Sequence, residues 1–399
     1  MRLPRFVINL ALTLLASTLV AACGGGGGGG TSVALPTTPG FEYSYAVPPA
    51  IGDGWEVADL ADVGMHQGTI ETMMQFVYDG EFAGIDSVVV ARNNKLVLYE
   101  QIRTSTGEFD EWIDNREPRR HVLHSTSKSF TSALIGIAID QGAIASTEVK
   151  FYDLFNYGAY QNWDDRKADI TLEDALTMRL GYEWDEWSLP YTDPNNDLVF
   201  LENNNFDWSK ALLDLPLQYD PGSRFTYNTA ATIAIGQALE NATGIPMADF
   251  ANQYLFYPMD ITTAEWGRTP TGLPNGGSGL FLLARDMAKF GQLFVDDGVW
   301  NGQQLISAGW IADSVARRVD ISAWATYSEA YGFQWWLDDF RYRGEDVAAY
   351  VTSGYGGQYI FCIPDLGLVV AFTGHNYNNG VGVQALYDMV QQYVLAAAT

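Results

Sequence analysis

A serine and a lysine stand three positions apart in the segment Ser125-Thr126-Ser127-Lys128. If a helix begins near Ser125, positions i and i+3 share one face, and the Lys128 amine then lies beside the Ser125 hydroxyl. The backbone N–H groups of the first helical turn point toward an incoming oxygen atom. A lysine can act as the base for a serine hydroxyl when burial or positive neighbours lower its pKa. The spacing therefore indicates nucleophilic catalysis by Ser125.

Other catalytic and metal-binding patterns are missing from the sequence. There is no Gly-x-Ser-x-Gly segment, which argues against an α/β-hydrolase design. Among the four histidines, only His121 and His124 have helical spacing, and their neighbours offer no third metal ligand, so we expect structural roles for both. With Cys23 and Cys362 as the two cysteines, a disulfide framework and a cysteine-rich metal site are excluded.

Two later segments strengthen the prediction of a serine nucleophile. The first is PGSRFTYNT at residues 221–229, which places Tyr227 after a Pro-Gly turn and before a helical run. The second is TSGYGGQ at residues 352–358, a glycine-rich stretch just before a predicted strand. Taken in order with the Ser-x-x-Lys segment, they resemble the serine hydrolases related to class C β-lactamases, closest to the branch of esterases and 6-aminohexanoate-dimer hydrolases. Further segments similar to that family lie at residues 176–179, 279–280, 284–291 and 331–336, so the resemblance covers about residues 60–395.

The resemblance implies a role for each motif residue. Ser125 would attack a carbonyl carbon, and Lys128 would help to remove its proton. Tyr227 would pass a proton to the leaving group and later activate water. The backbone N–H groups of Ser125 and Tyr355 would form the oxyanion hole, and no metal or organic cofactor is required.

The sequence departs from the family pattern at two positions. The second motif usually reads Tyr-x-Asn, and here Thr229 replaces the asparagine, with Asn228 beside it. The third motif of β-lactamases opens with a lysine that binds a carboxylate, and here Thr352 stands at that position. The loss of that charge favours a neutral or differently charged ester or amide over a dedicated β-lactam substrate.

The substrate pocket is expected around the stretch GYEWDEW at residues 181–187, where related enzymes place a loop over the active site. Aromatic and acidic groups together could hold an amine-bearing or aromatic substrate. The alternative is that these aromatic side chains complete the core of a helical layer. The predicted substrate contacts are Tyr182, Trp184, Glu186, Tyr191, Asn228, Thr229, Thr352, Ser353 and Gly354.

The elements that position these residues follow from the periodicity of the sequence. Asn93-Asn94 between two β-rich runs predicts a hairpin, and residues 358–372 predict another. Helical spacing is present over residues 55–83, 125–142 and 383–394. We therefore expect an α/β (α+β) fold in which helices flank an antiparallel sheet. The resemblance implies that this fold is of the β-lactamase/transpeptidase type. The expected units are a sheet domain at residues 46–148 and 266–399 and a mainly helical domain at residues 149–265.

The first 22 residues resemble a secretion signal, with Arg2 and Arg5 before an apolar run that is short for a bilayer span. The sequence VAAC at residues 20–23 resembles a bacterial lipobox, in which Cys23 is lipidated. Seven glycines follow, so residues 23–45 are expected to be a flexible tether. We expect an extracytoplasmic lipoprotein that faces the periplasm from the outer membrane and contacts lipid through its anchor alone. The alternative is an ordinary secreted protein in which Cys23 is incidental.

The charge of the chain narrows the possible partners. Against 22 Lys and Arg there are 48 Asp and Glu, a formal net charge of −26. Such a surface repels a phosphate backbone, so we expect no nucleic acid as partner. The family resemblance implies a small ester or amide as ligand. Three functions stay open: an esterase or amidase that forms an acyl-enzyme, a β-lactamase or D-amino-acid peptidase of the cell wall, and a binding or sensor protein without turnover.

Overall fold

The computed structural model of the protein describes residues 41–102, 120–377 and 382–399. Within these residues, a nine-stranded sheet has the strand order β1-β3-β2-β14-β13-β12-β11-β10-β9. Neighbouring strands are antiparallel, except that β1 and β3 are parallel. The strands are β1 (Glu56–Val57), β2 (Ile85–Arg92), β3 (Lys95–Gln101), β9 (Val319–Asp320), β10 (Ala330–Tyr331), β11 (Trp336–Tyr342), β12 (Glu345–Gly354), β13 (Gln358–Ile363) and β14 (Leu368–Gly374).

Both predicted hairpins are confirmed. Asn93 and Asn94 join β2 to β3 with φ values of 51° and 63°, and positive φ at both central residues is the geometry of a tight two-residue turn. A short 3-10 turn, Pro364–Leu366, and Gly367 at φ 55° join β13 to β14. Because β14 pairs with β2, strands from the two ends of the chain are neighbours in the middle of the sheet.

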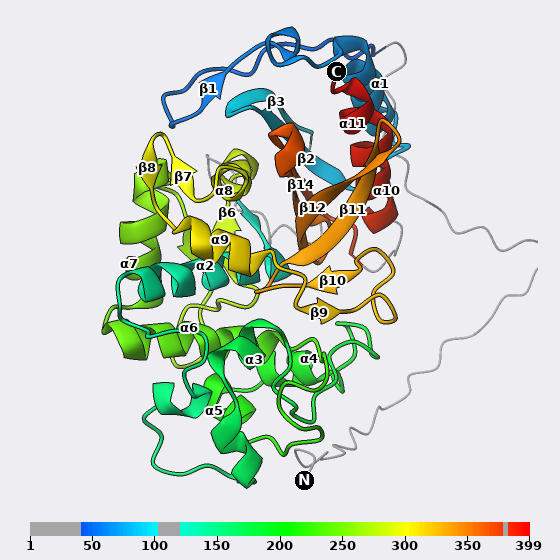
Figure 1. Ribbon diagram of the computed structural model, residues 1–399. Helices are drawn as coiled ribbons and strands as arrows, with labels where there is room; N and C mark the ends of the chain where they lie inside the picture. The colour runs from blue at the N-terminus through cyan, green and yellow to red at the C-terminus, as the bar shows by residue number, and fades with distance from the viewer. Residues whose placement is uncertain (1–40, 103–119, 378–381) are drawn as a thin grey trace, which may run out of the picture.

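Helices cover both faces of the sheet, as predicted (Figure 1). Alternate residues of β2 face opposite sides. Val88 and Val90 pack in one core, which includes residues of α1 (Gln67–Tyr78), α10 (Gly382–Met389) and α11 (Leu395–Ala397). Val89 and Ala91 pack in the other, with α2 (Ser127–Asp140) and α8 (Ala284–Val295).

The predicted helix at residues 55–83 is wrong in its first part. The helix α1 begins only at residue 67, and Leu60–Val63 is a separate 3-10 turn. Gly64 ends that turn with φ 69°, a conformation that breaks a helix. The His66 ring then accepts a hydrogen bond from the backbone of α1 and so starts the helix.

The middle of the chain is mainly helical, and most of its helices lie in the lower part of the molecule in Figure 1. The helix α6 is buried over most of its length and contacts α2, α3 and α5, so it passes through the centre of this layer. The helices of this layer are α3 (Leu172–Leu176), α4 (Asp197–Glu202), α5 (Trp208–Leu213), α6 (Thr229–Thr243) and α7 (Met247–Ala251). Elements that no sequence pattern indicated include β4 (His121–Val122), β5 (Glu265–Trp266), β6 (Leu280–Leu282), β7 (Val299–Trp300), β8 (Gln303–Gln304) and α9 (Ala308–Ser314).

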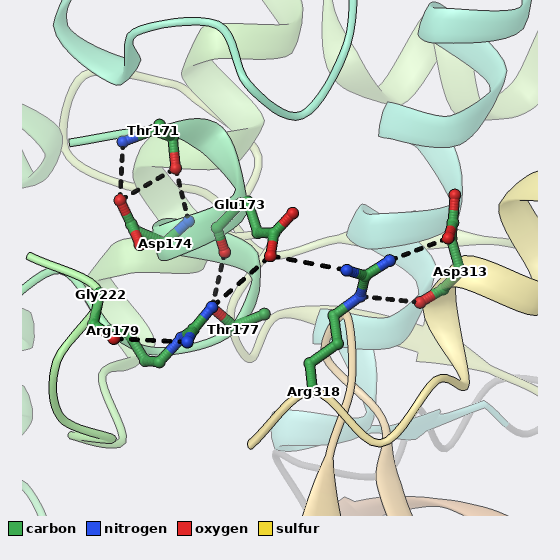
Figure 2. Close-up of polar contacts among 8 residues, drawn as sticks. All are labelled: Thr171, Glu173, Asp174, Thr177, Arg179, Gly222, Asp313 and Arg318. Atoms are coloured by element: carbon green, nitrogen blue, oxygen red, sulfur yellow. Dashed lines mark hydrogen bonds and ion pairs between the residues drawn. The ribbon is translucent and has the colours of Figure 1, made fainter. Parts of the chain in front are cut away.

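An arginine network ties the helical layer to α9 (Figure 2). Glu173 on α3 lies 3.6 Å from Arg179 and 3.5 Å from Arg318. Arg318 also pairs with Asp313 on α9 at 2.9 Å. Arg179 donates a hydrogen bond to the carbonyl oxygen of Gly222 at 3.3 Å. The network therefore fixes the Pro-Gly turn, from which the chain runs to the second motif, against α3.

Replacing Glu173 with alanine is expected to destabilise the protein by about 1–3 kcal/mol. The Glu173 side chain is 23% exposed, and its loss takes a counter-charge from two arginines that are only 20% and 22% exposed. Urea denaturation followed by tryptophan fluorescence measures the change in unfolding free energy. The matched control is Asp346→Ala, which removes an exposed ion pair with Arg341 and should change stability little. Equal destabilisation by the two variants would contradict a specific role for the network.

Candidate active site

Ser125 lies in a single 3-10 turn, His124–Thr126, that joins β4 to α2. The backbone at His124 has φ 46°, a left-handed conformation that is strained for a residue with a side chain. Thr126 is fully buried and donates a hydrogen bond to the carbonyl oxygen of Gln358 at 2.7 Å. These features fix the turn against β13 and leave Ser125 partly exposed at its tip.

Lys128 lies in the first turn of α2 and is 1% exposed. Its Nζ donates hydrogen bonds to Ser125 Oγ at 2.9 Å and to the carbonyl oxygen of Gly277 at 2.8 Å. Burial lowers the pKa of Lys128 to about 8, and the negative charges of Glu186 and Glu202 act in the opposite direction. Near neutral pH a useful fraction of this amine is therefore uncharged and able to accept the Ser125 proton.

Tyr227 contacts the same serine from the helical layer. Its side chain lines the same cleft as Ser125 and interacts with it, and its ring centroid lies 5.0 Å from Lys128 Nζ. Burial, followed by the charge of Glu186, raises the pKa of Tyr227 far above its ordinary value, and the interaction with Ser125 only partly offsets this rise. Tyr227 is therefore a protonated phenol at neutral pH. The structure thus brings together the three side chains that the sequence singled out.

The end of β12 packs closely on the chain that leads into Ser125. A Cβ atom on Gly354 would lie 2.2 Å from the carbonyl oxygen of Leu123, so any side chain here would push β12 away from the nucleophile. Tyr355 comes next in the chain and lines the same cleft as Ser125. Its backbone N–H is thus a candidate oxyanion donor beside that of Ser125.

A cleft of about 420 Å³ opens at Ser125. Trp187 is 54% exposed and packs on Trp324, with ring centroids 4.4 Å apart. Trp187 and Trp336 also contact the ring of Tyr227, at 5.5 and 5.7 Å. A cleft of this size with aromatic walls suits a small, largely apolar substrate. The lining residues are Ser125, Glu186, Trp187, Ser188, Leu189, Pro190, Tyr191, Tyr227, Trp336, Ser353, Gly354, Tyr355, Gly356, Gly357, Tyr359, Asn376, Gly382 and Val383.

Residues 46–391 match a family model described as Beta-lactamase. The chain belongs to the beta-lactamase family. A relative of this beta-lactamase-family protein is the 6-aminohexanoate-dimer hydrolase of Paenarthrobacter ureafaciens, which is 26% identical over 272 residues. The match covers 63% of this chain and 64% of the relative, so it spans less than two thirds of the relative's length.

Solved structures of other proteins have a similar fold. A beta-lactamase/D-alanine carboxypeptidase from Yersinia pestis, complexed with citrate, has a TM-score of 0.62 at 16% identity, with 86% of this chain and 100% of that chain covered. A family VIII carboxylesterase has a TM-score of 0.59 at 16% identity, with 82% and 96% covered. These similarities establish the predicted β-lactamase/transpeptidase-like fold.

Several predicted substrate contacts line the cleft of this beta-lactamase-family protein, namely Glu186, Tyr191, Ser353 and Gly354. Tyr182 and Trp184 do not line it, which corrects the prediction. Tyr182 is 1% exposed, and its hydroxyl hydrogen-bonds with that of Tyr152 at 2.8 Å within the helical layer. Trp184 is 7% exposed and donates from Nε1 to the Glu186 carboxylate at 2.9 Å. These two aromatic side chains complete the core.

Asn228, Thr229 and Thr352 are also outside the lining of the cleft, against prediction. Asn228 caps the N-terminus of α6 with its side chain. Thr229 is fully buried and donates from Oγ1 to Glu186 at 2.7 Å. Thr352 is fully buried, and because strand residues alternate, it faces away from the side on which Ser353 meets the cleft.

Sequence reasoning missed Trp336 and Asn376, which line the cleft from β11 and from the segment after β14. Trp336 lies within a stretch that resembles the family, yet its local pattern does not indicate contact with Tyr227. Trp187 was also missed. It directly follows Glu186 in the stretch where the pocket was expected, and this position in the sequence could have identified it as a residue of the cleft.

The two histidines at helical spacing make packing contacts. His121 is 5% exposed, and its Nε2 lies 3.4 Å from the carboxylate of Asp86. The ring of His124 packs against the rings of Tyr355 and Tyr377. Across the part of the chain that the structure describes, no group of three or more His, Cys, Asp or Glu is placed to hold a metal ion.

Proposed function

We propose that this protein is a serine hydrolase that cleaves small, uncharged esters or amides through an acyl-enzyme on Ser125. The observation that carries the proposal is the 2.9 Å contact between Lys128 Nζ and Ser125 Oγ at the base of an open cleft. Tyr227 lines the same cleft, and its ring centroid lies 5.0 Å from Lys128 Nζ, which places an acid beside the base. Membership of the beta-lactamase family supports the same assignment.

Acylation begins when the neutral amine of Lys128 accepts the Ser125 proton as Oγ bonds to the substrate carbonyl carbon. The carbonyl oxygen becomes an oxyanion, which the backbone N–H groups of Ser125 and Tyr355 stabilise. Tyr227 then gives its proton to the leaving oxygen or nitrogen and regains one from Lys128. The bond to the leaving group breaks, and the acyl group remains on Ser125.

Deacylation repeats these proton transfers with water as the nucleophile. A water molecule attacks the acyl carbon, and its proton passes through Tyr227 to the neutral amine of Lys128. The tetrahedral intermediate collapses, the carboxylic acid leaves, and Lys128 returns the proton to Ser125 Oγ. The site is then in its starting protonation state.

The charge of the cleft favours an uncharged substrate. Among the lining residues that the structure describes, Glu186 is the only one with a charged side chain. A substrate carboxylate, such as that of a β-lactam drug or a D-alanyl peptide, would therefore meet no lysine or arginine in this lining. This observation favours a neutral ester or amide over the cell-wall alternative.

A substrate panel with intact-mass detection tests the proposal. We expect turnover of a p-nitrophenyl ester and of the p-nitroanilide with the same acyl group, with an acyl adduct on Ser125 after rapid quenching. A chromogenic cephalosporin should have a kcat/KM at least about 30-fold lower than the ester, because its carboxylate lacks a charged partner. Preferred turnover of the cephalosporin or of a D-alanyl-D-alanine peptide would instead support the cell-wall function. A stable adduct without product release would support a binding protein.

We also propose that the protein is a lipoprotein of the outer membrane, anchored through Cys23, which lies outside the described residues. The lipobox-like sequence and the seven glycines after it support the proposal. None of the helices in the described ranges is long and apolar enough to cross a bilayer. Cys23→Ser is expected to move the protein from the membrane pellet to the soluble fraction, as measured by immunoblotting after ultracentrifugation. A variant that still requires detergent for extraction would overturn this proposal.

A further inference from the structure

Glu186 is a buried acid beside the candidate catalytic residues, and its side chain is 1% exposed. A glutamate is almost never fully buried without partners. In the sequence, Glu186 follows Tyr182 and precedes the helix α4. The backbone of Tyr182 forms an isolated β-bridge with Leu217.

The Glu186 carboxylate accepts hydrogen bonds from three donors. The Thr229 backbone N–H lies at 2.6 Å, the Thr229 hydroxyl at 2.7 Å and the Trp184 indole N–H at 2.9 Å. The Tyr191 hydroxyl is a fourth donor, at the longer distance of 3.4 Å. All of these groups are hydrogen-bond donors, and an ionised carboxylate only accepts hydrogen bonds, so the environment suits the charged form of Glu186. The four donors leave the carboxylate oxygens little capacity to accept a hydrogen bond from a substrate amine. This corrects the expectation that Glu186 contacts substrate through its charge.

The bonds to Thr229 fix the backbone at the N-terminus of α6. Thr229 is the first residue of α6, where a backbone N–H has no partner within the helix. The negative carboxylate also interacts favourably with the positive end of this helix. Because Tyr227 is only two residues away, holding Thr229 restricts the direction from which the Tyr227 hydroxyl reaches Ser125.

The same carboxylate acts on Lys128 through its charge. The charged and titratable groups that face Lys128 are Glu186 from the pocket loop, Glu202 at the end of α4, Tyr227 before α6 and His124 before Ser125. Glu186 and Glu202 raise the pKa of Lys128, against the larger effect of burial. Burial also raises the pKa of Glu186 itself, which the Lys128 charge and the Thr229 bonds oppose.

We propose, on the basis of the serine hydrolase function above, that Glu186 is a positioning residue. Its carboxylate holds the start of α6 so that Tyr227 meets Ser125, and it faces the Lys128 amine with a negative charge. Positioning errors of about 1 Å in such a site can cost about 100-fold in rate. Glu186 therefore acts on the reaction through Tyr227 and Lys128.

Glu186→Gln keeps the side-chain volume, removes the charge and replaces one acceptor by a donor. We expect kcat to fall about 10- to 100-fold with KM changed less than about 3-fold, because the substrate does not bind this group. The acid limb of kcat/KM, which in the wild type follows loss of a proton from Lys128 with a pKa of about 8, should move to lower pH. The sign follows because a lost negative charge makes the ammonium easier to deprotonate.

Two further variants distinguish the effect of Glu186 on the position of Tyr227 from the effect of its charge on Lys128. Thr229→Val removes one hydrogen bond to the carboxylate and keeps its charge, so kcat should fall without movement of the acid limb. Asp193→Asn removes a charge from the same loop with no contact to Lys128, and should change neither quantity. If Glu186→Gln folds poorly, Glu186→Asp and Thr229→Val still test the proposal. Glu186→Asp keeps the negative charge on a shorter side chain, so the acid limb should stay at the same pH while kcat falls.

The outcomes distinguish this proposal from the function on which it rests. If Glu186→Gln keeps wild-type kcat and an unmoved acid limb while Ser125→Ala abolishes turnover, the role of Glu186 is wrong and the serine hydrolase stands. If Ser125→Ala leaves turnover intact, the proposed function itself fails.

Discussion

Ser125→Ala is expected to lower kcat/KM for every hydrolysed substrate by at least about 10⁴-fold. The change removes the oxygen atom that lies beside both Lys128 and Tyr227. Without this nucleophile, proton transfer by Lys128 and Tyr227 cannot lead to an acyl-enzyme. Residual hydrolysis would come only from water attacking substrate held in the cleft. Initial rates with the p-nitrophenyl ester measure the loss, and intact mass should show that the acyl adduct has disappeared.

The fold should survive this change, because Lys128 keeps its hydrogen bond to the Gly277 carbonyl oxygen. Thermal unfolding followed by circular dichroism checks that it does. Ser188→Ala is the matched control, since Ser188 also lines the cleft but bonds to Asp185. Its rate should stay within about 3-fold of the wild type. Hydrolysis of all substrates at wild-type rates by the Ser125 variant would show that the nucleophile lies elsewhere.

Tyr227→Phe is expected to lower kcat/KM for the p-nitroanilide by about 10²- to 10³-fold. The phenol of Tyr227 beside Ser125 is protonated, and an amine leaving group needs its proton. The loss for the p-nitrophenyl ester should be smaller, because p-nitrophenolate leaves without protonation. The ratio of the two losses, measured with one acyl group, therefore reports proton donation by Tyr227.

Packing alone would not produce that ratio. The phenylalanine ring retains the contacts with Trp187 and Trp336, so KM should change little. Tyr359→Phe is the control, because Tyr359 lines the cleft but its hydroxyl accepts a hydrogen bond from Ser353. Equal losses for ester and anilide in the Tyr227 variant would contradict a role as proton donor.

The parts of the site that could be predicted depend on short-range spacing or on whole motifs. Ser125 and Lys128 are one helical turn apart, so local geometry alone predicts their contact. Tyr227 comes from a distant segment, and only the resemblance to a known family paired it with Ser125. The hairpin between β2 and β3 was predictable because Asn93 and Asn94 tolerate positive φ.

The pocket was harder to predict because side-chain direction depends on tertiary packing. Tyr182 turns inward to Tyr152, and no local pattern distinguishes it from Tyr191, which reaches the cleft. Thr352 and Ser353 are neighbours in the sequence but face opposite sides of β12. Which of the two residues lines the cleft depends on which face of β12 is turned toward Ser125, and the local sequence does not show this.

The central position of β14 affects when the protein can fold. Arg92 of β2 is paired with Leu368, so the inner partner of the β2–β3 hairpin is synthesised long after the hairpin itself. Contacts between such distant segments form slowly. A nascent or prematurely terminated chain would leave the edges of β2 and β13 open to other chains. Early stop codons should therefore yield aggregating fragments and no smaller enzyme.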